Sequence, residues 1–138
     1  AEKMPKEKFA NLHDALCGAG FECLQGNDAA ALFSHYLSDN LSLRYVRKGS
    51  FLPEMEFKLS KDQLDEKQLA ERVKLPLTGL PFWFSTIETN IAFKEGLLKS
   101  PKDLEDARHL RIIYSESISE AKIGEILALI KKYRLGGK

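Results

Sequence analysis

The stretch that decides the fold is LSLRYVRKGSFLPEMEFKL, residues 41–59. Apolar and polar residues alternate over 41–47 and again over 54–59, which is typical of strands that bury one face. The short link at residues 48–50 contains a glycine and predicts a hairpin connection between these strands. Because side chains alternate along a strand, the second strand separates two sets of side chains. One face carries Glu54, Glu56 and Lys58, and the other carries Met55, Phe57 and Leu59.

The segment before this hairpin predicts two helices and a short strand. Pro5 suits a first helical turn, and apolar residues at helical spacing predict a helix over 5–18 that ends at a pair of glycines. Residues 21–24 are typical of a short strand. A second, short helix is predicted over residues 29–33, with Asn27 or Asp28 as its N-cap.

After the hairpin the sequence becomes helical in two steps. Residues 60–72 are polar and locally helical, and residues 73–77 and 80–84 predict two short edge strands around a Thr-Gly turn. From residue 85 onward the apolar period is helical. Three capping signatures each predict a helix start: Ser85 with Glu88, Ser100 with Asp103, and Ser117 with Glu120. The buried stripe of the second of these helices is predicted to be Leu104, Ala107, Leu110, Ile113 and Tyr114.

Length and composition fit one compact domain. The chain has 138 residues, of which 43% are hydrophobic and 30% are charged, and a chain of this size can bury a core without disulfides or metals. We therefore predict a single domain over residues 1–138, with a sheet-containing part at 5–84 and a helical tail at 85–135. The predicted fold class is α+β, a small mixed or antiparallel sheet with N-terminal helices and a C-terminal three-helix tail.

Charge and targeting signals exclude several classes of protein. The 21 basic and 20 acidic residues give a net charge of +1, which does not favour nucleic acid as a partner. No uncharged apolar run is long enough to span a membrane. Residues 1–7 lack the apolar core of a signal peptide, and Cys17 and Cys23 have the spacing of neither a disulfide framework nor a zinc site. These observations predict a cytoplasmic protein in which both cysteines are buried as small apolar groups.

Glu54 and Glu56 form a first candidate site, because they lie two apart on one strand face. Paired carboxylates can bind a hard cation such as Mg²⁺, which leaves its other positions to water or phosphate. An ordinary solvated strand face is the alternative interpretation. The three histidines lie far apart in the sequence and do not favour a metal site, and the common phosphate-loop, nucleophile and metalloprotease motifs are missing from the sequence.

A second candidate site lies in the predicted helical tail. Lys94 and Lys102 can present their charges to a phosphate, with Asp103 and Asp106 holding the two lysines in place. The alternative is a plain ion pair between Lys102 and Asp106, which lie four residues apart on one helical face. Such a pair at an exposed site contributes only about 0.3–0.5 kcal/mol.

The segment around these lysines also resembles part of a known superfamily. The segment resembles the C-terminal half of minimal nucleotidyltransferases of the DNA polymerase β-like superfamily. The resemblance rests on a strand end followed by Ser-x-x-Glu, a helix with Ala-x-Lys, and Lys-Asp-x-x-Asp-x-x-x-Leu. The likeness extends over residues 5–114, and residues 54–59 are similar to the strand that carries the family's third catalytic carboxylate. The matching positions are Ser85, Glu88, Ala92, Lys94, Lys102, Asp103, Asp106 and Leu110.

The resemblance implies a nucleotidyltransferase-like fold with a nucleoside triphosphate and Mg²⁺ as ligands, in a polar concavity between the acidic strand face and the lysine-bearing helices. Glu56 corresponds to the third catalytic acid and would ligate the metal. The family's glycine-serine and Asp-x-Asp elements precede the matched part and are not in this sequence. The expectation is therefore a portion of a longer transferase or a catalytically incomplete relative that keeps a phosphate-binding face. The residues expected at phosphate are Lys58, Lys94 and Lys102, and the supporting residues are Glu54, Glu88, Asp103 and Asp106.

The alternative function is protein interaction without catalysis, as a homodimer or as a subunit of a partner. It rests on the Phe-Trp-Phe sequence at 82–84 in a proline-bounded edge segment, because exposed aromatic side chains often mark contact sites. We expect Phe82 and Phe84 themselves to pack in the core. Nucleic acid binding is a weaker third choice that rests on basic residues at 44–48 and 131–134, and the latter already complement a helix C-terminus.

Overall fold

The structure of the chain is a computed structural model that describes residues 1–74, 79 and 81–136. The fold is α+β, as predicted, with helices and small antiparallel sheets. The chain forms two compact units, Ala1–Lys61 and Asp62–Lys138. This boundary lies before the predicted division at residue 85, because the helix at 63–70 packs against the last helix of the chain. Within the described residues, no helix is both long enough and apolar enough to cross a membrane.

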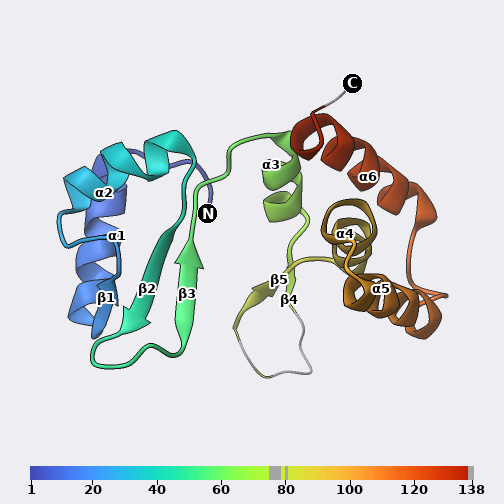
Figure 1. Ribbon diagram of the computed structural model, residues 1–138, viewed down its shortest axis with the longest axis horizontal. Coiled ribbons are helices and arrows are strands. Elements are labelled where there is room, and N and C mark those ends of the chain that lie inside the picture. Colours follow the sequence, from blue (N-terminus) through green and yellow to red (C-terminus); the bar gives the residue numbers. More distant parts are fainter. Residues whose placement is uncertain (75–78, 80, 137–138) are drawn as a thin grey trace. The chain divides into compact units, whose positions relative to one another are not determined.

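The first unit is an antiparallel sheet with two helices packed on it (Figure 1). Its elements are α1 (Lys6–Gly18), β1 (Phe21–Cys23), α2 (Ala29–His35), a 3₁₀ turn (Leu37–Asp39), β2 (Leu43–Arg47) and β3 (Glu54–Phe57). The strand order is β1-β2-β3, so β2 is the central strand. Asp28 is the cap of α2, because its side chain accepts a hydrogen bond from the Ala30 N–H at 3.0 Å.

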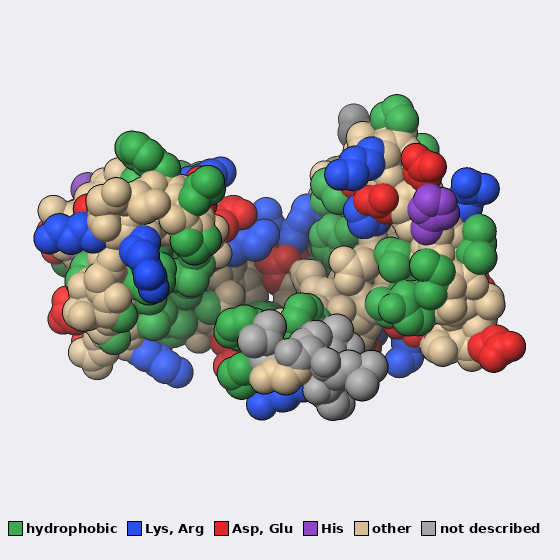
Figure 2. Space-filling model, turned by 90° about the horizontal axis from the view of Figure 1, so that it is seen from below, with side chains coloured by type: hydrophobic (Ala, Val, Ile, Leu, Met, Phe, Trp, Pro, Cys, Tyr) green, Lys and Arg blue, Asp and Glu red, His purple; other side chains and the backbone are tan. Residues whose placement is uncertain are grey.

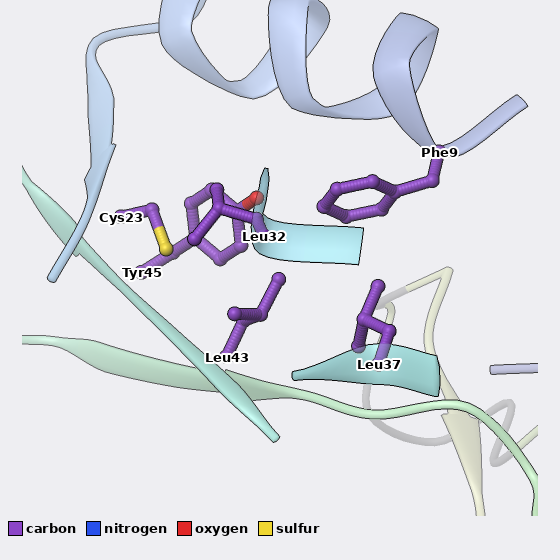
Figure 3. Close-up of a cluster of buried hydrophobic side chains, with 6 residues drawn as sticks. All are labelled: Phe9, Cys23, Leu32, Leu37, Leu43 and Tyr45. Carbon is purple, nitrogen blue, oxygen red and sulfur yellow. The ribbon is translucent and has the colours of Figure 1, made fainter. Parts of the chain in front are cut away.

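The core of the first unit lies between these helices and the sheet. Figure 3 shows the buried cluster, which comprises Phe9, Cys23, Leu32, Leu37, Leu43 and Tyr45. In the register, Leu43 is paired with Phe57 and Tyr45 with Met55, so the apolar face of β3 is turned toward this core, as predicted. Met55 is nevertheless exposed, because β3 is an edge strand, and the strand ends at Phe57, before Leu59.

A buried polar side chain, His13 on α1, forms hydrogen bonds inside this unit. Its Nε2 lies 3.2 Å from the Asn27 carbonyl oxygen, and its Nδ1 lies 2.8 Å from the Tyr45 hydroxyl. A carbonyl only accepts, so Nε2 donates to it, and in the tautomer with its proton on Nε2 the ring accepts the Tyr45 hydroxyl at Nδ1. Burial raises the pKa of Tyr45, which keeps this donor protonated. Of the two cysteines, Cys23 is buried as predicted, whereas Cys17 is exposed on α1.

Replacing Tyr45 with phenylalanine is expected to lower the free energy of unfolding by about 1–3 kcal/mol, because it leaves the buried Nδ1 of His13 without its donor. Urea denaturation followed by circular dichroism measures the change. Tyr114→Phe, at an exposed tyrosine, is the control and should change stability by less than about 0.5 kcal/mol. Equal stability of the two variants would contradict the assigned hydrogen bond.

The second unit packs helices around a separate apolar core. Its elements are α3 (Gln63–Ala70), β4 (Val73–Lys74), β5 (Trp83–Phe84), α4 (Ile87–Phe93), a π-helical turn (Lys94–Leu98), α5 (Pro101–Ile113) and α6 (Glu120–Arg134). Helix α4 packs against α5 and α6, and α3 packs against α6. β4 and β5 pair as an antiparallel ribbon. Residues 75–78 and 80, which belong to the two predicted strands, lie outside the described residues. The buried residues are Leu64, Ile91, Ala92, Ile123, Ile126 and Ile130.

Helix starts in the second unit differ in part from the prediction. Ser100 caps α5 as predicted. Thr86 rather than Ser85 caps α4, because the Ser85 hydroxyl instead accepts a hydrogen bond from a glutamine side chain of α3. Ser119 rather than Ser117 caps α6, because the backbone of Ser117 is still hydrogen-bonded in the turn that follows α5.

The predicted buried stripe of α5 is only partly correct. Ala107 is buried and Leu110 packs against the core, but Leu104, Ile113 and Tyr114 are exposed. Helix α5 packs against α4 and the π-helical turn. This contact covers only some of the apolar residues of α5, so the others are exposed.

Candidate functional site

The lysine at the centre of the predicted site begins the π-helical turn that follows α4. The helix passes directly into this turn, whose first residue is Lys94. Gly96 permits the turn to approach α6 closely, since a Cβ on it would lie 2.7 Å from Leu127 Cδ2. The close packing gives Lys94 a defined position.

The Lys94 ammonium is held by two carboxylates of α5. Its Nζ lies 3.3 Å from Asp103 Oδ1 and 3.0 Å from Asp106 Oδ2. The two aspartates are three residues apart, so they share one helical face. Hydrogen bonds to Asp106 and then to Asp103 raise the pKa of Lys94, which keeps its charge at neutral pH. The structure thus brings together one predicted lysine and both aspartates that were predicted to hold it.

Asp103 is itself held by the N-cap of α5. Ser100 Oγ accepts from the Asp103 N–H at 3.1 Å, and its hydroxyl donates to the Asp103 carboxylate. The hydrogen bond from Ser100, followed by that from Lys94, holds the pKa of Asp103 below its usual value. Because the carboxylate and the ammonium are both charged at neutral pH, their contact persists there.

Arg111 of α5 reinforces the same turn, and sequence spacing did not reveal it. Its Nε lies 2.6 Å from Glu95 Oε1 and its Nη2 lies 2.9 Å from Glu95 Oε2, which is a bidentate ion pair. Hydrogen bonding to Arg111 holds the pKa of Glu95 below its usual value. Glu95 follows Lys94 directly, so this pair fastens the lysine-bearing turn to α5. The two partners are 16 residues apart in the chain, which is too far for a helical spacing rule.

The other two predicted residues of the second unit have different surroundings. Lys102 is exposed in the first turn of α5. Glu88 on α4 accepts a hydrogen bond through Oε1 from the Ser119 N–H at 3.2 Å. This contact joins α4 to the cap of α6, which is a structural role for Glu88.

The predicted acidic half of the site lies in the first unit. Glu54 forms an ion pair with Arg44 on β2, and Glu56 is paired directly opposite Arg44 in the register. Glu56 and Lys58 are exposed. Arg44 therefore compensates negative charge on the face that was predicted to bind a cation. Among the described residues, no group of three or more histidine, cysteine, aspartate or glutamate side chains is arranged to hold a metal ion.

The acidic and basic halves of the predicted site belong to different units. Glu54, Glu56 and Lys58 are in the first unit, whereas Lys94 and Lys102 are in the second. The polar concavity that they were predicted to share stays a prediction.

The aromatic segment at 82–84 lies largely at the surface. Phe82 is 58% exposed and Trp83 is 55% exposed, so the prediction that Phe82 packs in the core was wrong, while Phe84 is half-buried. The cationic groups of Arg72 and Lys74 lie 5.0 and 4.7 Å from the centroid of the Trp83 ring. Figure 2 shows hydrophobic and basic side chains at the surface in the lower centre of the view, where this ribbon lies.

Comparisons of the chain with protein-family models, with curated proteins and with solved structures found no match. A nucleotidyltransferase-like assignment therefore rests on the resemblance of the sequence alone.

Proposed function

We propose that the chain is a nucleotidyltransferase-like domain in which Lys94 binds the phosphates of a nucleoside triphosphate. The observation that carries the proposal is the contact of Lys94 Nζ with Asp103 and Asp106, at 3.3 and 3.0 Å. Two carboxylates from one helix fix the direction of the ammonium group, whereas a lysine on an open surface samples many rotamers. An ammonium group that is already oriented loses less entropy when it binds an anion.

One donor of Lys94 is available to a ligand. An ammonium group carries three N–H donors, and Asp103 and Asp106 accept two of them. The Lys94 side chain is only partly buried, so a phosphate oxygen can reach the third donor. Lys102 lies in the first turn of α5, where the helix N-terminus adds partial positive charge. These features supply attraction for phosphate on one side of the second unit.

The charges of this cluster favour the magnesium complex of the nucleotide over the free triphosphate. Lys94 and Lys102 are balanced by Asp103 and Asp106, so the four side chains are neutral together. A bound Mg²⁺ lowers the negative charge of the triphosphate, which reduces its repulsion from the two aspartates. We therefore propose the Mg²⁺–nucleotide complex as the ligand of the Lys94 cluster.

Calorimetric titration with ATP in the presence of Mg²⁺ tests the proposal. The chain should bind with a dissociation constant of about 1 mM or below. Lys94→Met should weaken binding at least about tenfold, because it removes a charge-assisted hydrogen bond to phosphate. Lys131→Met, at an exposed lysine of α6, is the matched control and should bind as the unmodified chain does.

Two outcomes would contradict the nucleotide site. One is the absence of heat at millimolar ATP and Mg²⁺, and the other is equal affinity of the Lys94 and Lys131 variants. Circular dichroism establishes that both variants are folded.

A further inference from the structure

The β4–β5 ribbon carries a second surface, which the nucleotide proposal does not use. Trp83 is the only tryptophan of the chain and is more than half exposed. Arg72 and Lys74 place their cationic groups 5.0 and 4.7 Å from the centroid of its ring. We propose that this surface binds single-stranded nucleic acid, with one base stacked on Trp83 and the phosphate of that nucleotide held by Lys74.

The register of the ribbon explains why Lys74 and Trp83 meet. Lys74 is paired directly with Trp83, so their side chains share one face of the ribbon, and Arg72 immediately precedes β4. The Arg72 guanidinium also donates to the Leu69 carbonyl oxygen near the end of α3. Arg72 is thereby held over the indole, which presents the ring in a defined orientation before a ligand arrives.

The chemistry of this surface fits a nucleobase together with its phosphates. Every base has a flat π-face, and a base stacked on an aromatic side chain interacts more strongly than an exposed cation over the same ring. A base can therefore displace the Lys74 ammonium from the indole, which brings that charge beside the phosphate of the stacked nucleotide. The net charge of +1 conceals this feature, because it averages over the whole chain.

Charge and shape distinguish this ligand from two other occupants. A second copy of the chain would bring the Lys74 ammonium groups of the two copies together, and like charges across an interface are unfavourable. An acidic peptide forms ion pairs with the cationic side chains but has no planar ring that stacks on the exposed indole. Single-stranded nucleic acid supplies both the negative charge and the stacking partner.

Fluorescence of the single tryptophan reports the stacking directly. Titration of the full chain with an oligouridylate of about ten nucleotides should quench Trp83. With one phosphate neutralised by Lys74, the affinity should fall about 2.6-fold between about 50 and about 200 mM salt. Lys74→Gln should remove most of the slope of that salt dependence. A slope that is the same in this variant would overturn the assignment of Lys74 to phosphate.

Anisotropy of a labelled oligouridylate extends the test to a variant without tryptophan. Trp83→Leu should weaken binding at least about fivefold at constant salt. Phe51→Ala, at an exposed aromatic of the first unit, and Lys94→Met should both bind unchanged, and the latter separates this site from the nucleotide site. Three results would overturn the proposal: no quenching at about 1 mM oligouridylate, unweakened binding by a folded Trp83→Leu variant, or equal quenching by polyglutamate.

Discussion

Replacing Arg134 with methionine should lower the free energy of unfolding by about 3 kcal/mol. Arg134, at the end of α6, donates through Nη1 to Asp62 and through Nη2 to Asp65 Oδ1 at 2.7 Å. The arginine side chain is 14% exposed and both aspartate side chains are 12% exposed, so water reaches them poorly. The variant would remove the guanidinium that pairs with two poorly hydrated carboxylates at the start of α3.

The effect of this substitution should depend on pH in one direction. Burial raises the pKa of Asp62, but hydrogen bonds from Arg134 and from the Asp65 N–H, together with the guanidinium charge, hold it below its usual value. A carboxylate with a lowered folded pKa stabilises the fold fully above its unfolded pKa of about 3.9. That contribution is lost as the pH falls through the folded pKa. The stability difference should therefore be constant near about pH 7 and shrink below about pH 4.

Urea denaturation followed by Trp83 fluorescence, which reports on the second unit, measures the change at each pH. Lys131→Met removes an exposed charge of the same sign from α6 and should change stability by less than about 0.5 kcal/mol. Combining Arg134→Met with Asp62→Asn and Asp65→Asn should recover part of the loss, because neither position then carries a poorly hydrated negative charge. Asparagine at the position of Asp62, which is the N-cap of α3, still caps the helix. A loss that persists unchanged in acid would contradict the role of this ion pair.

Replacing Phe9 with alanine should destabilise the first unit by about 3–5 kcal/mol. The Phe9 ring is fully buried, and its centroid lies 6.0 Å from that of Phe33 and 5.8 Å from that of Phe57. It therefore joins α1 to both α2 and β3. Removing the ring loses its transfer free energy and leaves a cavity between three elements, which can collapse only partly.

Phe51→Ala is a matched control for this substitution, because it makes the same chemical change at a side chain that is 84% exposed. It should alter the free energy of unfolding by less than about 0.5 kcal/mol. Urea denaturation followed by far-ultraviolet circular dichroism compares the two variants with the unmodified chain. Similar stabilities of the Phe9 and Phe51 variants would show that the cluster in Figure 3 is not the core of the first unit.

Elements whose signals lie within a few residues were predicted well. Alternation over 41–47 and 54–59 predicted an antiparallel pair, and the register of β2 with β3 confirms it. The Asp28 and Ser100 caps were correct for the same reason, since a cap bonds the backbone of its own first turn. The caps at residues 85 and 117 were wrong, because the spacing rule does not distinguish between neighbouring hydroxyl residues that compete for the same helix start.

The candidate site was only partly predictable. The pattern of lysines and acids predicted that Asp103 and Asp106 hold Lys94, but the contact between them depends on how the chain turns between α4 and α5. No local pattern indicated that Phe82 is exposed or that two cations lie over Trp83. A short two-stranded ribbon is too small to bury all of its apolar side chains. The apolar composition of residues 82–84 therefore led to too high an estimate of their burial.

Hydrophobic period, capping residues and turn residues in the chain are sufficient to specify the helices and strands, because those interactions act over one or two turns of backbone. Packing between distant segments settled the rest: which face of α5 is buried, which carboxylate holds Lys94, and that Arg134 meets Asp62 across 72 positions of sequence. Burial and ion pairing depend on which residues surround a side chain after folding. Many of these residues are distant in the sequence, so a local sequence pattern does not identify them.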